Sequence, residues 1–163
     1  MSSRKRSPET DAGIDRQSSF RSVLWDPDAH HPFGNVRPDV MVTFADCDVR
    51  IPIDAKYKEY DNKKLAPADL YQAAIYAMAL ARVPGPAIRP CVLFHPSAPP
   101  SATPTITQRV QVRAAGGALA EVTAVGLPVE RLLAEDRLAE NLASRQVAVI
   151  VGQALEVQRA VPA

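Results

Sequence analysis

The chain has 163 residues, and its 19 basic and 18 acidic side chains leave a net charge of +1. This length suits one ordinary domain with a hydrophobic core, and it is too short for two large domains. Because the charges balance, no overall electrostatic field indicates nucleic acid or an anionic membrane as a partner. Any site for a polyanion must therefore be local.

Residues 1–30, which open "MSSRKRSPETDAGIDRQSS", are rich in serine and charge and poor in large apolar side chains. A segment of this composition buries too little apolar surface to offset the conformational entropy lost on ordering. We therefore expect a mobile N-terminal arm over residues 1–30 and one domain over residues 31–163. Trp25 and Phe33 are expected to anchor the arm to the core rather than to stack on bases.

Two β-rich runs follow, "VRPDVMVTF" at 36–44 and "DVRIPIDAKY" at 48–57. The short polar connection between them predicts an antiparallel hairpin. Pro52 lacks the N–H that a sheet ladder uses, so we expect the second run to be an edge strand or to contain a bulge.

The rest of the chain alternates between helical and strand-like patterns. Pro67 and Asp69 begin an alanine-rich run that predicts a helix over 67–82. Strands are predicted at 90–96, 106–115 and 118–127, and a further helix at 129–146. Together these elements predict an α/β fold with a central mixed sheet of about four or five strands flanked by helices.

Cysteine usage and the apolar runs bear on where the protein works. Cys47 and Cys91 are isolated and lack the CxxC spacing of a metal or redox motif. The sequence contains neither an apolar secretion segment nor an apolar run of about 18 residues, the length that crosses a membrane. We therefore expect reduced thiols in a cytoplasmic protein that has no membrane partner.

The stretch "IDAKYK" at 53–58 places charge on an otherwise apolar strand. Side chains two apart on a strand share a face, so Asp54 and Lys56 point together while Ile53 and Ala55 point the other way. The hairpin brings Asp39 to the same end of the strand pair. Two convergent carboxylates suit Mg²⁺, and a nearby lysine can neutralise charge on a phosphoryl group. This set is typical of phosphodiester cleavage.

These residues resemble a known signature. "RPD" at 37–39 followed by "IDAK" at 53–56 is similar to the motif of the PD-(D/E)xK nuclease superfamily, which has a restriction-endonuclease-like fold. "DLYQAAIYA" at 69–77 adds the QxxxY spacing of its RecB-like branch. With "VLFHP" at 92–96, the region 36–96 most closely resembles the nuclease domain of McrC-type proteins from modification-dependent restriction systems.

The resemblance implies a role for each matching residue. Asp39 and Asp54 would be metal ligands, with the Ala55 carbonyl as a third ligand, and Lys56 would be the catalytic lysine. The implied metal is Mg²⁺, for which Mn²⁺ would substitute. The implied reaction is hydrolysis of DNA, and the implied partner is a GTP-driven AAA+ motor.

Further residues are expected around this core. Gln72 and Tyr76 would brace the site, which agrees with their i and i+4 spacing on one helical face. Lys58 shares the face of Lys56 if the strand continues, and Lys63 and Lys64 lie nearby in sequence. We expect these three lysines to contact the DNA backbone, although a solvated turn is the alternative for the last two.

Other interpretations stay open. Asp54 and Lys56 alone could be an edge-strand charge pair that guards against aggregation. The chain could also be a free-standing DNA repair or processing nuclease, or a non-cutting module that retains the fold to bind DNA or to assemble. It has no room for the larger N-terminal region of McrC-type proteins, and Glu9, the only glutamate before Asp39, is not assigned to the site. Homo-oligomerisation is possible.

Overall fold

The structure is a computed structural model of the chain. It describes residues 12–16, 19–44, 48–60, 62–85, 87–98, 103–130 and 152. The helix predicted at 129–146 lies almost entirely outside these residues, as do Glu9 and Cys47.

Eight strands and one helix are described. In chain order they are β1 (Ala12–Arg16), β2 (Phe20–Asp26), β3 (His31–Val36), β4 (Val40–Phe44), β5 (Val49–Ala55), α1 (Pro67–Leu80), β6 (Arg89–Pro96), β7 (Thr105–Ala114) and β8 (Gly117–Leu127). The strands predicted in the second half of the chain are confirmed, and the helix predicted over 67–82 ends at Leu80.

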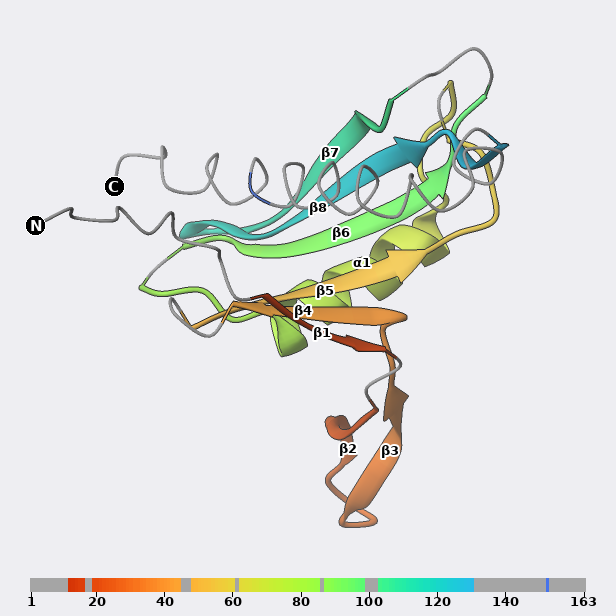
Figure 1. The fold of residues 1–163 in the computed structure, drawn as a ribbon. Coiled ribbons are helices and arrows are strands. Elements are labelled where there is room, and N and C mark those ends of the chain that lie inside the picture. Colours follow the sequence, from red (N-terminus) through yellow and green to blue (C-terminus); the bar gives the residue numbers. More distant parts are fainter. Residues whose placement is uncertain are drawn as a thin grey trace, which may run out of the picture.

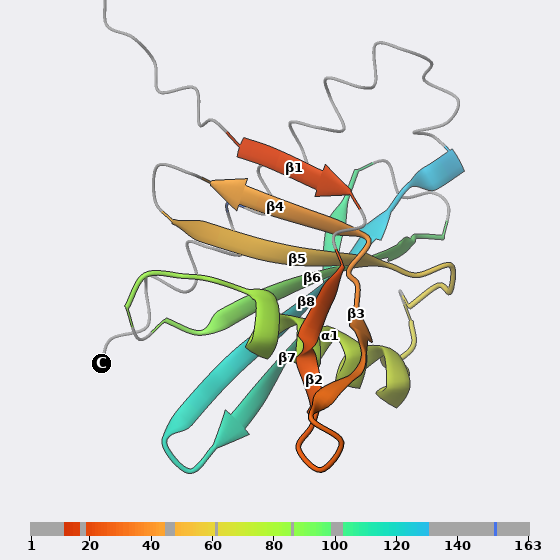
Figure 2. The same ribbon diagram turned by 90° about the horizontal axis from the view of Figure 1, so that it is seen from below.

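Six strands form one mixed sheet in the order β1-β4-β5-β6-β8-β7 (Figure 1). β5, β6 and β8 run parallel, whereas β1, β4 and β7 are antiparallel to their neighbours. Figure 2 shows the strands fanned across the molecule with α1 lying over one face. The expectation of an α/β protein with a mixed sheet is confirmed, and the sheet is larger than expected.

The predicted hairpin is confirmed, because β4 and β5 pair antiparallel from Val40–Ile53 to Phe44–Val49. The expected edge position of Pro52 is wrong: β5 lies inside the sheet between β4 and β6. The ladder between β5 and β6 begins only at Ile53, one residue beyond the proline. That ladder therefore does not need the N–H that Pro52 lacks.

The first 30 residues contain more regular structure than their composition predicts. β1 pairs with β4 at one edge of the large sheet, and β2 pairs with β3 in a separate hairpin. The arm expected over 1–30 therefore does not describe these two strands. The boundary at residue 30 stays a prediction.

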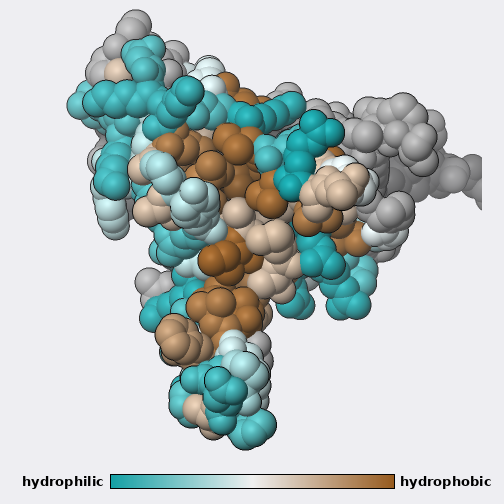
Figure 3. Space-filling view, turned by 180° about the vertical axis from the view of Figure 1, so that it is seen from behind, coloured by the Kyte–Doolittle hydropathy of each residue, from teal (hydrophilic) through white to brown (hydrophobic). Residues whose placement is uncertain are grey.

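The hairpin of β2 and β3 projects away from the body of the molecule (Figure 1). Trp25 is 52% exposed and Phe33 is 75% exposed, so the expectation that they anchor an arm to the core is wrong. Figure 3 shows that apolar side chains gather where the projection joins the body, while its tip is hydrophilic. Phe20, Val23 and Val36 of this hairpin pack in or against the main core instead.

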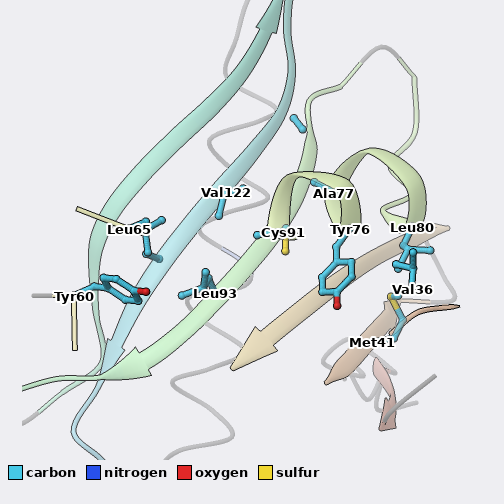
Figure 4. Packing of buried hydrophobic residues seen from close by; sticks show 13 residues of the cluster. Val36, Met41, Tyr60, Leu65, Tyr76, Ala77, Leu80, Cys91, Leu93 and Val122 are labelled. Carbon is cyan, nitrogen blue, oxygen red and sulfur yellow. The ribbon is translucent and has the colours of Figure 1, made fainter. Parts of the chain in front are cut away.

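The main core lies between α1 and the sheet. Small residues of α1, including Ala73 and Ala77, let the helix approach Cys91 and Leu93 of β6 closely (Figure 4). A second cluster on the opposite face of the sheet contains Ile53. Burial of both faces fixes which side chains of β5 point toward α1. Among the described residues, no helix is long and apolar enough to cross a membrane.

Candidate active site

The two expected acidic residues meet at one rim of the sheet. Asp39 directly precedes β4, and Asp54 is the penultimate residue of β5. The backbone N–H of Ala55 donates a 2.7 Å hydrogen bond to Asp39 Oδ2. Pairing of Val40 with Ile53 sets this register. The hairpin therefore brings both carboxylates to the same end of the strand pair.

Asp54 is the buried acid of the site, with 4% of its surface exposed. Burial raises the pKa of Asp54; Lys56 lowers it, and the nearby charge of Asp39 raises it again, with a net increase. Within the described part of the chain, Asp54 Oδ2 accepts no hydrogen bond of good geometry, although Lys56 Nζ lies 2.7 Å away. This oxygen is therefore held by the charge of Lys56, and a metal cation would compete with Lys56 for it.

Lys56 occupies the centre of the site. Its Nζ lies 2.7 Å from Asp54 Oδ2 and donates a 2.6 Å hydrogen bond to Gln72 Oε1. Burial lowers the pKa of Lys56, but the interactions with Asp54 and Asp69 outweigh burial and raise the pKa. Lys56 is therefore an ammonium ion at neutral pH. The predicted alternation is confirmed, because Asp54 and Lys56 interact while Ile53 packs into the opposite cluster.

Gln72 and Tyr76 connect the helix to both strands. Gln72 Nε2 donates to the Tyr76 hydroxyl at 2.8 Å, and that hydroxyl donates to the Arg37 carbonyl at 2.9 Å. Tyr76 is 4% exposed and reaches from α1 between Cys91 and Val36 (Figure 4). The chain of hydrogen bonds runs from Lys56 to the residue two before Asp39. The bracing role expected of Gln72 and Tyr76 stays a prediction.

Two residues at this site did not emerge from the sequence. Asp69 Oδ1 lies 3.6 Å from Lys56 Nζ, and the Tyr60 hydroxyl donates a hydrogen bond to Asp69 Oδ2. Burial raises the pKa of Asp69, but Tyr60, Lys56 and Lys58 outweigh it, so the pKa is lowered overall. Asp69 precedes Gln72 by three residues, which places both on one helical face. This spacing is the signal that could have identified Asp69, which the sequence presented only as an acid in the first turn.

Of the other expected lysines, Lys58 contacts this cluster. Lys58 is exposed, and its Nζ lies 3.6 Å from Asp69 Oδ2. Lys63 and Lys64 are exposed in the connection between β5 and α1. Gln108 Nε2 donates to the carbonyl of Lys63, which fixes part of this connection. All three lysines are therefore open to solvent, and Lys58 is in contact with the site.

The donor set can be compared with the needs of a divalent cation. Among the described residues, no group of three or more His, Cys, Asp or Glu side chains is placed to bind a metal. Mg²⁺ needs fewer, because it usually takes one or two carboxylates and keeps several waters. Asp39, the buried oxygen of Asp54 and the Ala55 carbonyl form a set of hard oxygen donors that fits this pattern.

Comparisons with known proteins add little beyond this geometry. No protein-family model matches the chain, and no curated protein matches it. Among solved structures, the chain is similar to part of the refined half-complex from the tetradecameric assembly of Thermococcus gammatolerans McrB AAA+ hexamers with bound McrC. The TM-score is 0.46 at 15% identity, over 71% of this chain. The chain spans 23% of the length of the chain that it matches.

Proposed function

We propose that the chain hydrolyses DNA phosphodiester bonds with the help of Mg²⁺ or Mn²⁺, as a PD-(D/E)xK-type nuclease. The observation that carries the proposal is the position of Lys56. Its ammonium group lies 2.7 Å from the buried carboxylate of Asp54, beside Asp39 at the rim of the sheet. An edge-strand charge pair would need neither burial nor a second acid, and β5 is not an edge strand.

Each residue has a separate role in this proposal. Asp39, Asp54 and the Ala55 carbonyl hold the cation, which would supply positive charge against the phosphate and lower the pKa of bound water. Lys56 stabilises the charge that develops on the phosphoryl oxygens, since a group whose pKa is raised is a poor base at neutral pH. Gln72 and Tyr76 act as positioning residues. Gln72 binds Lys56, Tyr76 binds the Arg37 carbonyl two residues before Asp39, and neither faces the reacting atoms.

The setting that we propose is a restriction or defence system of McrC type, with an AAA+ GTPase or ATPase as partner. It rests on the resemblance of residues 36–96 and on the net charge of only +1. Cys91 is a buried free thiol, which agrees with a cytoplasmic location. A free-standing nuclease is the alternative, and partner dependence separates the two.

The test is cleavage of DNA by the wild type and by Asp54→Asn and Lys56→Ala. Asp54→Asn keeps the shape of the side chain and removes its charge. We expect each variant to cut at least about a hundredfold more slowly, the scale on which removing one charge-stabilising group lowers kcat. Cleavage is measured with Mg²⁺, with Mn²⁺ and with EDTA.

Asp48→Asn is the matched control. Asp48 is exposed and pairs with Arg82 at 3.0 Å, at the opposite end of β5. This variant should cut at the wild-type rate. Wild-type activity in Asp54→Asn or Lys56→Ala, with the melting temperature unchanged, would show that the site assignment is wrong.

A further inference from the structure

Lys56 is shared between two acids that belong to different elements. Asp54 at the end of β5 holds it at 2.7 Å, and Asp69 in the first turn of α1 lies at 3.6 Å. The Lys56 side chain is only 16% exposed, so water replaces little of either interaction. The proposed function uses Asp54 as a metal ligand and leaves Asp69 without a role.

Asp69 is held firmly enough to act as a fixed anion. Its side chain is 13% exposed, and each carboxylate oxygen faces a named partner. Oδ1 faces Lys56, whereas Oδ2 accepts the Tyr60 hydrogen bond and lies 3.6 Å from Lys58. A carboxylate with both oxygens engaged keeps its orientation when one neighbour moves.

Tyr60 is itself fixed from behind. It is 4% exposed, and its ring meets the ring of His95 edge-on with centroids 5.6 Å apart. The Tyr60 N–H donates to His95 Nδ1 at 3.3 Å, and its carbonyl accepts from Gln108 Nε2 at 3.3 Å. His95 Nε2 in turn lies 2.8 Å from Thr107 Oγ1. The side chains of β6 and β7 thus brace the hydroxyl that holds Asp69.

The charges of the cluster change sign with a bound cation. Without one, the acids at 39, 54 and 69 outnumber the lysines at 56 and 58, and Asp54 is the nearer partner of Lys56. A divalent cation at Asp39 and Asp54 would compete with Lys56 for Asp54, because both are drawn to the same oxygen. Lys56 would then be repelled from the site unless a second anion held it.

We propose that Asp69, oriented by Tyr60, is the positioning residue that retains Lys56 in the site when Asp54 is committed to a cation. Asp69 does not touch the reacting atoms. It gives Lys56 a second ion-pair partner on α1. Lys56 then remains directed at the phosphate while Asp54 binds the metal. The inference rests on the proposed function for its purpose, but the pairing that it predicts can be measured without catalysis.

The experiment measures how fast an amine-acylating reagent, sulfo-N-hydroxysuccinimide acetate, labels Lys56 in the full chain, followed by peptide mass spectrometry. The proteins are the wild type, Asp54→Asn, Asp69→Asn and the double variant, all without divalent ions. Each single variant leaves one acid beside Lys56, so labelling should stay within about twofold of the wild type. The double variant should label about fivefold faster or more, as expected for loss of the remaining ion pair.

Adding Mg²⁺ tests the exchange of partners. In the wild type Lys56 should remain slow to label, whereas in Asp69→Asn it should label about fivefold faster with Mg²⁺ than without. Lys63 and Lys64 are exposed and serve as internal references, because their labelling should not change in any variant. If the double variant does not fold, Tyr60→Phe in the Asp54→Asn background replaces it and should give a smaller rise.

The outcomes separate the two proposals. Equal Lys56 labelling in Asp54→Asn and in the double variant would overturn the role of Asp69, whatever the enzyme does. If Mg²⁺ raises the melting temperature of Asp69→Asn but leaves Lys56 labelling unchanged, the exchange of partners is wrong. If Mg²⁺ alters neither the melting temperature nor labelling in any protein, the metal site of the proposed function fails, and the metal-free comparison still decides whether Asp69 holds Lys56.

Discussion

At the scale of single residues, the site depends on an unfavourable charge that the fold tolerates. Asp54 has its pKa raised by burial and by Asp39, so its ionised form is less favourable in the folded chain than in the unfolded chain. Lys56 offsets only part of this cost. A buried acid with a net penalty is a natural place for a cation to bind, because binding removes the penalty.

The first consequence concerns stability without metal. Asp54→Asn removes the buried charge and its repulsion from Asp39, while Lys56 keeps Asp69 and Gln72 as partners. We expect its melting temperature at pH 7 in EDTA to equal or exceed that of the wild type. Saturating the wild-type site with Mg²⁺ at ten times its Kd should add about 1.4 kcal/mol, or roughly 3–6 °C for a domain of this size.

Differential scanning fluorimetry with increasing Mg²⁺ or Mn²⁺ checks this prediction. The melting temperature of Asp48→Asn should rise with the ion as the wild type does, and that of Asp54→Asn should not. An equal rise in Asp54→Asn would mean that the stabilising ion binds elsewhere.

At the scale of elements, α1 fixes the geometry of the site that two strands supply. Gln72 binds Lys56 after β5, and Tyr76 binds the Arg37 carbonyl before β4. The helix packs on the sheet through alanines, so these polar groups approach the strand ends closely. The two strand ends are therefore held together by the helix as well as by the hairpin register.

This arrangement predicts that Gln72→Ala affects activity more than stability. Gln72 lies largely at the surface and fills little of the core, but without its amide Lys56 loses a 2.6 Å hydrogen bond. We expect cleavage to fall about tenfold or more, as for other residues that orient a site, with little change in melting temperature. Tyr76→Phe should lower both cleavage and the melting temperature, since it removes the hydrogen bond from the hydroxyl to the Arg37 carbonyl, worth about 1 kcal/mol.

Tyr71→Phe is the control for the helix, because Tyr71 lies on α1 with 66% of its surface exposed. Its activity and melting temperature should match those of the wild type. If Gln72→Ala cleaves at the full rate and its melting temperature falls strongly, Gln72 stabilises the fold and does not position the site.

Local patterns made the β4–β5 hairpin and α1 predictable. The alternation of Ile53, Asp54 and Ala55 depends only on strand geometry. A hairpin with a short connection fixes which acids lie at the same end of the strand pair. The i and i+4 spacing of Gln72 and Tyr76 likewise needs no tertiary knowledge. The expected site residues of this part of the chain are therefore found together.

Features set by distant partners were not predictable in the same way. β1 carries little apolar pattern of its own, and it forms because β4 offers an edge with which Ile14 can pair opposite Val42. The tolerance of Pro52 inside the sheet depends on where the β5–β6 ladder starts, and this is set by β6, which lies some 40 residues later in the chain. The place of Asp69 in the site likewise depends on Tyr60, whose position is set by His95 and Gln108 far along the chain.

At the scale of the whole molecule, the charges nearly balance, and two lysines of the site are already engaged by an acid. The net charge is +1, and Lys56 and Lys58 are already within 3.6 Å of Asp69. Lys63 and Lys64 are exposed in the connection between β5 and α1, and the projecting β2–β3 hairpin carries Trp25 and Phe33 at the surface. If the proposed function holds, these few lysines near the site would give weak contact with a duplex.

The last prediction is that the isolated chain binds DNA weakly and cuts it poorly without a partner. Few lysines can neutralise phosphates, so the slope of log affinity against log salt concentration should be only about −2 to −4. Lys63→Ala with Lys64→Ala should make the slope shallower by about one to two, because each phosphate contact contributes about one. Affinity is measured by fluorescence anisotropy across salt concentrations, and cleavage is measured with and without a candidate AAA+ partner and GTP. Tight binding and robust cutting by the chain alone would instead identify a free-standing nuclease.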